Sequence, residues 1–151
     1  MEDEQKIVEI SKRRKYFDVF FPEIIGQDFR KDVPKLPNSC PCCGYLTLER
    51  RCSWEICAFC FWEDDGQDDI DANIVEAGPN GGYSLTEYRL IFFDELRTFK
   101  NNQVENSPAF LIGKELTILD NLIYNQIVDN EIAFNQIKLL TTLFDDLRMQ
   151  L

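Results

Sequence analysis

The sequence predicts an α+β protein in which helices flank a small β-hairpin that carries clustered cysteines. Three observations support this fold class. All six cysteines lie between Cys40 and Cys60, the residues between them alternate as in a β-hairpin, and apolar residues recur at helical spacing on both sides. A chain of 151 residues is long enough for one globular domain, or for a small module with helical additions.

The N-terminal segment, residues 1–37, is predicted to be a helix followed by a linker. Apolar residues recur at helical spacing over residues 4–21, and Pro22 ends the pattern. The basic run at residues 12–15 is expected to lie mostly on the exposed side of this helix. Residues 30–39 contain two prolines and few apolar residues, which is typical of a linker.

The central segment, residues 38–100, is predicted to begin with the hairpin. Strand-forming residues at 45–48 and 53–56 surround a polar turn, which indicates an antiparallel hairpin over residues 45–57. The acidic stretch at residues 63–71 does not match the spacing of an EF-hand loop. We interpret it as a solvated, turn-forming loop, and an acidic patch for a partner or a metal or catalytic site stay open as alternatives.

Helices are predicted for the rest of the chain. Ser84 and Glu87 match a capping box at the start of a helix over residues 85–100. In the C-terminal segment, residues 101–151, two apolar series at helical spacing indicate an antiparallel pair of helices that turns near residues 129–130.

The cysteine spacing predicts a metal site. Cys40 and Cys43 form one C-x-x-C pair, and Cys57 and Cys60 form a second pair 13 residues later. Two such pairs, presented by tight turns, suit one tetrahedral Zn²⁺ ion with a structural role. Iron in the same tetrahedron, a redox dithiol and inert thiols remain alternatives.

The other two cysteines are expected to lie outside this site. Cys42 would leave only one residue between itself and Cys40, and no matching C-x-C follows, so we interpret it as an uncoordinated thiol near the metal. Cys52 is expected to be a free thiol near the hairpin tip. The aromatic residues Phe59, Phe61 and Trp62 are expected to cover the metal and to pack on the helix that follows.

Charge and motifs exclude several classes of function. Net charge is −11, and Lys plus Arg number six against eighteen Asp plus Glu from Ser53 onward, which disfavours binding to nucleic-acid phosphates. The chain has no histidine and no catalytic motif that we recognise, so we expect no enzyme. Without a bilayer-spanning run or a signal-type segment, we expect a cytoplasmic protein.

With these residues in view, the chain resembles the bacterial cysteine-rich CPCC family. The matching blocks are CPCCGYLTL, WEICAFCFWEDDGQDD and GPNGGYSLTEYR, which span about Cys40 to Phe99. The resemblance implies a small zinc-ribbon protein, and the placement of some members among toxin and immunity genes implies an interaction role. The chain departs from the family at Arg51 and Cys52, where a glycine is usual, and at Glu87, where the helix is usually alanine-rich.

We therefore expect a non-enzymatic zinc-binding protein-interaction module. On the charge balance and the family association, it would be an immunity or inhibitor protein that acts on a basic, toxin-like protein partner. Two other functions stay open: a zinc-ribbon protein associated with nucleic acid or regulation, and a thiol redox protein.

Overall fold

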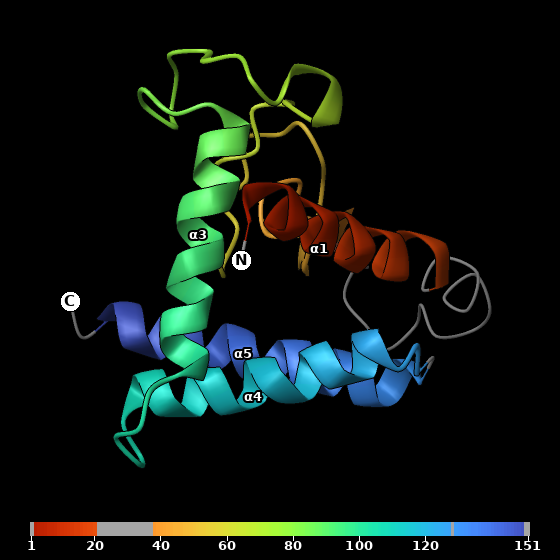
Figure 1. Ribbon diagram of the computed structural model, residues 1–151, viewed down its shortest axis with the longest axis vertical. Helices are drawn as coiled ribbons and strands as arrows, with labels where there is room; N and C mark the ends of the chain where they lie inside the picture. The colour runs from red at the N-terminus through yellow and green to blue at the C-terminus, as the bar shows by residue number, and fades with distance from the viewer. Residues whose placement is uncertain (1, 21–37, 128, 150–151) are drawn as a thin grey trace. The chain divides into compact units, whose positions relative to one another are not determined.

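The computed structural model describes residues 2–20, 38–127 and 129–149. It divides into two compact units, Met1–Phe92 (unit 1) and Phe93–Leu151 (unit 2), whose α-helices are labelled in Figure 1. Four α-helices and one pair of short antiparallel strands form the described part of the chain, so the predicted α+β class is confirmed. None of the described helices has both the length and the hydropathy needed to cross a bilayer.

Unit 1 begins with helix α1 (Asp3–Lys15), which continues into a π-helical turn, η1 (Tyr16–Phe20). The first turn of α1 is acidic and its last turn is basic, a distribution that complements the helix dipole. Its buried face includes Ile10 and Phe17. The predicted N-terminal helix is confirmed for these residues, whereas its predicted end and most of the predicted linker fall in residues 21–37, outside the described residues.

The hairpin differs from the prediction. Strand β1 (Asn38–Ser39) pairs antiparallel with β2 (Leu46–Leu48), so the first strand comes from the end of the predicted linker. The expected single hairpin over residues 45–57 is wrong. The chain after β2 instead folds back on itself further along, where Trp54 N–H donates to the Asp64 carbonyl at 3.0 Å.

Side chains and backbone angles explain why residues 49–55 leave the strand. The backbone N–H groups of Glu49 and Arg50 donate to the Glu55 carboxylate, both at 3.1 Å, so a side chain takes the place of a ladder partner. Cys52 and Trp54 have φ angles of 59° and 64°, which are incompatible with extended backbone. The alternating sequence indicated extended residues correctly at 46–48 but could not identify their partner.

Helix α3 (Leu85–Lys100) begins at the predicted capping box. The Glu87 N–H donates to Ser84 Oγ at 3.1 Å, and the Ser84 N–H donates to the Glu87 carboxylate at 3.3 Å. The predicted helix over residues 85–100 is confirmed. A short 3₁₀ turn, η3 (Asp69–Asp71), lies in the preceding acidic loop.

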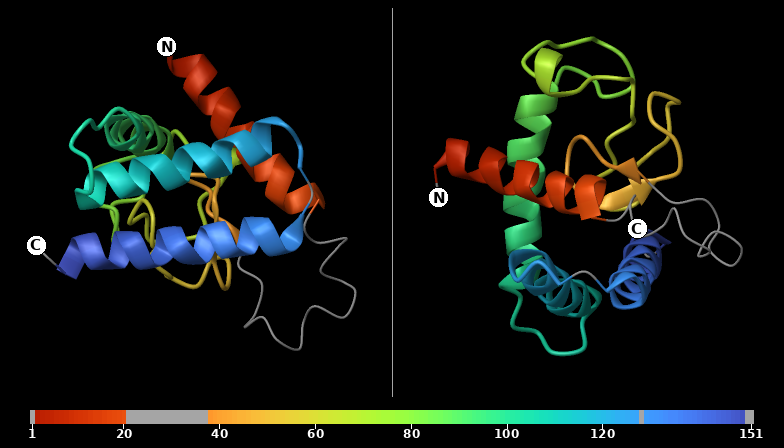
Figure 2. Two further views of the ribbon diagram at one scale, coloured as in Figure 1. Left: turned by 90° about the horizontal axis from the view of Figure 1, so that it is seen from below. Right: turned by 90° about the vertical axis from the view of Figure 1, so that its right-hand side faces the viewer.

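Unit 2 contains the end of α3 and an antiparallel helix pair, α4 (Pro108–Tyr124) and α5 (Asn130–Met149), which Figure 2 shows lying alongside each other. The predicted C-terminal helical pair is confirmed. Ser107 caps α4 by accepting the Phe110 N–H at 3.1 Å. The interior is apolar and contains Phe93, Leu96, Ile112, Leu116, Leu119, Ala133, Phe134, Ile137, Leu140 and Phe144.

Close packing of α4 against the end of α3 depends on Gly113. A Cβ atom at this position would lie 2.0 Å from the Phe99 carbonyl oxygen, which is far inside van der Waals contact. Phe99 also packs edge-to-face on Phe144 of α5, with ring centroids 5.7 Å apart.

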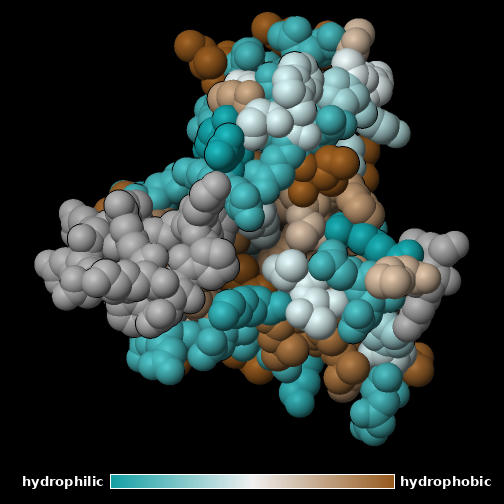
Figure 3. Space-filling model, turned by 180° about the vertical axis from the view of Figure 1, so that it is seen from behind, coloured by the Kyte–Doolittle hydropathy of each residue, from teal (hydrophilic) through white to brown (hydrophobic). Residues whose placement is uncertain are grey.

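On the molecular surface, hydrophobic residues are interspersed with hydrophilic ones on the face drawn in Figure 3.

Candidate metal centre

Two backbone turns of the same design carry the two C-x-x-C pairs. In the first turn, residues 40–45, the Cys40 N–H donates to the Tyr45 carbonyl at 2.8 Å and the Gly44 N–H donates to the Cys40 carbonyl at 2.9 Å. In the second turn, residues 57–62, the Cys57 N–H donates to the Trp62 carbonyl at 2.9 Å and the Phe61 N–H donates to the Cys57 carbonyl at 3.0 Å. Each turn therefore presents its two thiols on one side of a closed loop.

A left-handed residue completes each turn. In the first turn this residue is Gly44, with φ of 80°, and a Cβ there would lie 2.9 Å from the Ile10 carbonyl oxygen. In the second turn it is Phe61, with φ of 67°. Glycine takes this conformation without steric cost, whereas a bulky residue is strained in it. In the sequence, Gly44 therefore indicated the left-handed residue of the first turn, whereas Phe61 gave no such indication for the second turn.

The structure brings the four predicted sulfur atoms together. The Sγ atoms of Cys40 and Cys60 are 3.7 Å apart, as are those of Cys43 and Cys57, and all four lie within 4.8 Å of one another. A tetrahedron with metal–sulfur bonds of about 2.3 Å has sulfur–sulfur edges of about 3.8 Å. The cluster therefore fits one tetrahedral ion.

Burial closes this cluster. The four cysteines are at most 3% exposed, and all six cysteines are free thiols. Four sulfur ligands would complete a tetrahedral shell and leave no position for water or substrate. The arrangement thus suits metal binding of a structural kind, and the soft thiolate ligands favour zinc, copper(I) or iron.

Polar groups around the cluster stabilise negative charge on sulfur. The backbone N–H groups of Cys42 and Phe59 each lie 3.4 Å from a sulfur, that of Cys40 and of Cys57 respectively. The Thr47 hydroxyl lies 3.0 Å from Cys57 Sγ. Such outer contacts orient metal ligands, and the role of Thr47 was not predicted from the sequence.

The thiols respond differently to this environment. Burial, together with neighbouring thiols, raises the pKa of Cys43 and of Cys60 well above that of an ordinary thiol. Burial also acts against the Cys57 thiolate, but contacts with the other three thiols and the Thr47 hydroxyl outweigh it and hold the pKa of Cys57 well below its usual value. Four buried thiolates therefore need a bound cation to coexist.

The remaining cysteines lie apart from the group of four. Cys42 is fully buried, and its thiol contacts that of Cys60, while burial raises its pKa. Cys52 is exposed and lies in the bend after β2, where its N–H donates to Asp64 at 2.7 Å. Neither sulfur belongs to the cluster whose atoms could share an ion.

Side chains from α1 and α3 hold the outer carbonyl groups of the two turns. Arg13 donates to the Cys43 carbonyl at 2.6 Å and lies over the Tyr45 ring, 4.0 Å from its centroid. Arg89 donates to the Pro41 carbonyl at 2.8 Å, and the Tyr88 hydroxyl donates to the Cys60 carbonyl at 3.1 Å. The two helices thus fix the positions of both thiol-bearing turns.

The basic run in α1 is therefore not a solvated face as predicted. Arg13 is 5% exposed, and Arg14 forms a two-point ion pair with Asp68, at 2.6 and 3.1 Å. Lys12 and Lys15 are exposed, as expected. The helical pattern gave no sign of this difference because the partners of the two arginines lie about 30 and 54 residues further along the chain.

The acidic loop is also not simply solvated. Asp64 is fully buried and accepts from Arg51 Nε at 2.9 Å, and Asp69 accepts from Arg89 at 2.6 Å. Burial alone would raise the pKa of Asp68, but Arg14, a backbone N–H group and Arg51 hold it well below its usual range. Three of the six carboxylates in this loop are thus paired with arginines.

The aromatic cover of the cluster is confirmed in part. Phe59 and Trp62 are buried, and Trp62 packs edge-to-face on Tyr88 of α3, with centroids 5.2 Å apart. Tyr45 packs on Phe59 at 5.3 Å. Phe61, in contrast, is 51% exposed and has a left-handed backbone.

Comparison with known families agrees with this centre. Residues 38–105 match the family described as Cysteine-rich CPCC, so the resemblance seen in the sequence is confirmed over this stretch, a little under half of the chain. Searches of curated proteins and of solved structures found no match. The matched stretch contains both thiol-bearing turns, the acidic loop and helix α3, and it leaves out helices α1, α4 and α5.

Proposed function

We propose that Cys40, Cys43, Cys57 and Cys60 bind one zinc ion whose role is structural. The observation that carries this proposal is the closed, buried set of four sulfur atoms with tetrahedral spacing. When bound, zinc supplies four strong bonds that tie the two turns together and takes no part in redox chemistry. Arg13, Tyr88 and Arg89 donate hydrogen bonds to the two turns, so the bound ion would also stabilise the position of the helices that carry these residues.

Metal analysis tests this proposal. Protein purified without chelator should contain about one zinc per chain. Cys57→Ser should reduce that content to near zero, whereas Cys52→Ser, a matched change at an exposed thiol outside the cluster, should leave it unchanged. Metal-free protein that keeps its fold, or an equal loss in both variants, would contradict a structural zinc site.

We further propose that the protein is a non-enzymatic interaction module with a basic protein partner. The net charge of −11 favours association with a cationic surface. A nucleic-acid role has less support, because Arg13, Arg14, Arg51 and Arg89 already bind oxygen atoms of unit 1. An immunity or inhibitor role toward a toxin-like partner rests on the family resemblance and stays a prediction.

Affinity capture from the native host tests the interaction. Tagged protein should retain a basic protein that elutes at high salt, since exposed charge pairs are screened by added ions. The double variant Asp145→Asn, Asp146→Asn removes two exposed negative charges of unit 2, and it serves as a control for the effect of net charge on capture. Capture of nucleic acid in place of protein would overturn this proposal in favour of the alternative.

A further inference from the structure

The hairpin formed by residues 54–64 carries two unlike sets of side chains. Ile56 pairs antiparallel with Glu63, and the second thiol-bearing turn closes the hairpin. One set is at most 3% exposed and contains Cys57, Phe59, Cys60, Trp62 and Asp64. Three large apolar side chains are instead more than half exposed, with Trp54 at 57%, Ile56 at 55% and Phe61 at 51%. We call these three residues the apolar patch, in which Ile56 lies between the other two along the hairpin.

Trp54 occupies a position in this hairpin that glycine usually takes. Its N–H donates to the Asp64 carbonyl at 3.0 Å, and the Asp64 N–H donates to the Glu55 carbonyl at 2.9 Å. Two residues of one strand thus lie opposite a single residue of the other, and the φ angle of Trp54 is 64°. This pattern is that of a G1 β-bulge, whose first residue is normally a glycine in the left-handed conformation.

Phe61 has the same property at the closed end of the hairpin. Its φ angle is 67°, and the corresponding residue of the first thiol-bearing turn is Gly44. Two large aromatic residues therefore stand at glycine-type positions, where an L-residue is strained. Strained backbone is concentrated at binding and switch sites, because elsewhere a less strained residue serves equally well. The hairpin thus combines backbone strain with the exposure of two aromatic side chains.

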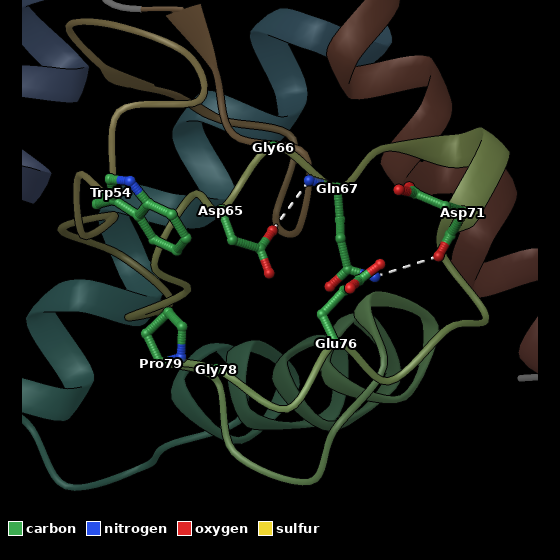
Figure 4. Close-up of a pocket in the computed structure, with 8 residues that line it drawn as sticks. All are labelled: Trp54, Asp65, Gly66, Gln67, Asp71, Glu76, Gly78 and Pro79. Carbon is green, nitrogen blue, oxygen red and sulfur yellow. Dashed lines mark hydrogen bonds between the residues drawn. The ribbon is translucent and has the colours of Figure 1, made fainter.

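The surface beside Trp54 is concave. A hollow of about 350 Å³ lies next to this residue, and Figure 4 shows the indole ring and Pro79 on one side of it, with the Asp65 carboxylate pointing in. Interface residues that contribute most to binding are typically aromatic and lie beside such recesses, which a side chain of the partner fills. The shape next to the apolar patch is therefore suited to a protruding side chain.

Carboxylates accompany the apolar patch. Glu63 lies opposite Ile56 in the hairpin, and Asp65 shares the hollow with Trp54. Within the described part of the chain, neither carboxylate forms an ion pair with a Lys or Arg side chain. The chain as a whole carries a net charge of −11. A partner that covers the patch is therefore favoured if it brings cationic groups beside its apolar ones.

We propose that the apolar patch docks a segment of a partner protein that combines apolar and basic side chains. The inference rests on the proposed interaction role, and it names the surface and the kind of segment. The three residues of the patch would bury apolar area against the segment, and Glu63 and Asp65 would meet its lysines or arginines. A second copy of this chain is a poorer occupant, because it brings the same negative charge.

Anisotropy titration of labelled, capped peptides with the full, metal-loaded chain tests the patch. The probe is a short peptide in which lysine alternates with leucine and phenylalanine. It should bind at least about tenfold more tightly than a peptide with serine at the apolar positions, or than one with glutamate in place of lysine. Equal binding of the serine peptide would show that charge alone attracts the probe, and equal binding of the glutamate peptide would overturn the basic chemistry of the segment.

Glycine at the strained positions separates docking from folding. Trp54→Gly should weaken the probe at least about tenfold, yet it should raise the melting temperature by about 2–4 °C, because glycine takes the left-handed conformation without strain. Phe61→Gly should also weaken the probe and leave the metal content unchanged. Tyr124→Ser, at an aromatic residue of unit 2 that is 86% exposed, should not alter binding. If Trp54→Gly lowers affinity and melting temperature together, Trp54 is a structural residue and the proposal fails.

A charge variant tests the role of the carboxylates. Glu63→Gln should weaken the probe about three- to tenfold and reduce the dependence of its binding on salt. Glu131→Gln removes an exposed carboxylate of unit 2 and should have little effect. An equal loss in both variants would mean that net charge attracts the probe and that the carboxylates beside the patch have no special role, which would refute the charge match.

Further comparisons separate this inference from the interaction role on which it rests. If a captured partner protein binds the Trp54→Gly, Phe61→Gly chain undiminished, the patch is refuted while the interaction role stands. If no partner protein is captured but the probe preference and its loss in Trp54→Gly hold, the patch stands and the proposed role falls. Self-association in sedimentation that disappears in the double variant would identify a second copy as the occupant. Binding of single-stranded oligodeoxythymidine that depends on Trp54 would likewise replace the protein segment by nucleic acid.

Discussion

The interior of unit 1 contains polar and charged side chains, whereas the described interior of unit 2 is apolar. Every buried polar or charged residue of the described chain lies in unit 1, namely Lys6, Arg13, Ser39, Asp64, Gln67, Ser84 and Arg89. Unit 2 buries the facing apolar sides of long helices. Unit 1 has strands of only two and three residues, so buried apolar side chains such as Phe59 and Trp62 come from turns and loops as well as from helices.

The difference shows how a small unit with little regular structure can be fixed in one conformation. Its four sulfur atoms provide one centre, and arginine–carboxylate pairs provide a second network around it. Buried polar networks demand that every member be present, because a group that loses its partner stays desolvated and unpaired. The loss of one side chain should therefore strongly destabilise unit 1, whereas the stability of unit 2 should fall gradually as packing contacts are removed.

Removal of the metal should have the largest effect. Chelation at neutral pH should remove about 10 kcal/mol of binding free energy that also stabilises the fold. The near-ultraviolet circular dichroism of buried Trp62 should disappear, while amide protection in α4 and α5 persists. Hydrogen exchange with mass spectrometry measures both units in one experiment, and parallel loss of protection in α4 and α5 would contradict the contrast between the units.

Loss of one buried carboxylate should have the next largest effect. Asp64→Ala removes the acceptor of Arg51 Nε and of the Cys52 and Gly66 N–H groups, and should lower the free energy of unfolding by about 3–5 kcal/mol. Asp65→Ala, one residue away and without an ion pair, should cost under about 1 kcal/mol. Urea unfolding of both variants checks this, and similar costs would show that the network is dispensable.

A packing change in unit 2 should be smaller. Gly113→Ala places a methyl group against the Phe99 carbonyl and should cost about 2 kcal/mol through forced separation of α3 and α4. Gly82→Ala meets no atom within 4 Å and should be nearly neutral. Thermal unfolding compares the two, and the metal content should remain unchanged in both. A loss of metal from Gly113→Ala would mean that unit 2 controls the metal centre.

The contrast also explains what the sequence could predict. Helices α3, α4 and α5 follow from local signals, since the Ser84 capping box, Pro108 and the apolar periodicity act within a few residues. The grouping of Cys40 and Cys43 with Cys57 and Cys60 follows from spacing, because two C-x-x-C turns have few other ways to satisfy four thiols. These predictions needed no knowledge of distant contacts.

The errors arose where distant segments meet. The pairing of β1 with β2, the burial of Arg13 and the ion pairs of Arg14, Arg51 and Arg89 join residues up to 54 positions apart. Local polarity marks an arginine or aspartate as exposed, and only tertiary structure reveals a partner. The sequence contained one signal for these contacts. Several arginines precede and follow the single acidic loop of unit 1, so ion pairs between them were an alternative to a solvated loop.

The smallest expected effect concerns pH. The ionised form of Asp68 is favoured in the folded protein, since Arg14 and Arg51 hold its pKa well below the usual value. A lowered folded-state pKa gives stability that is present above the unfolded pKa of about 4 and is lost as pH falls below it. Asp68→Asn should therefore cost about 1 kcal/mol at pH 7, a value reduced by solvent screening at this half-buried site.

This cost should shrink as the pH falls below about 4, because the unfolded wild-type chain there takes up a proton at Asp68 whereas the folded chain, in which the pKa of Asp68 is lower, does not. Denaturant unfolding of both proteins between pH 7 and pH 3 provides the difference, from which acid release of the metal cancels because both chains carry the same cysteines. Asp146→Asn, at an exposed position of unit 2, should show no such trend. A difference that stays constant with pH would mean that Asp68 acts through shape and hydrogen bonding alone, and the charge network of unit 1 would then contribute less than its buried geometry indicates.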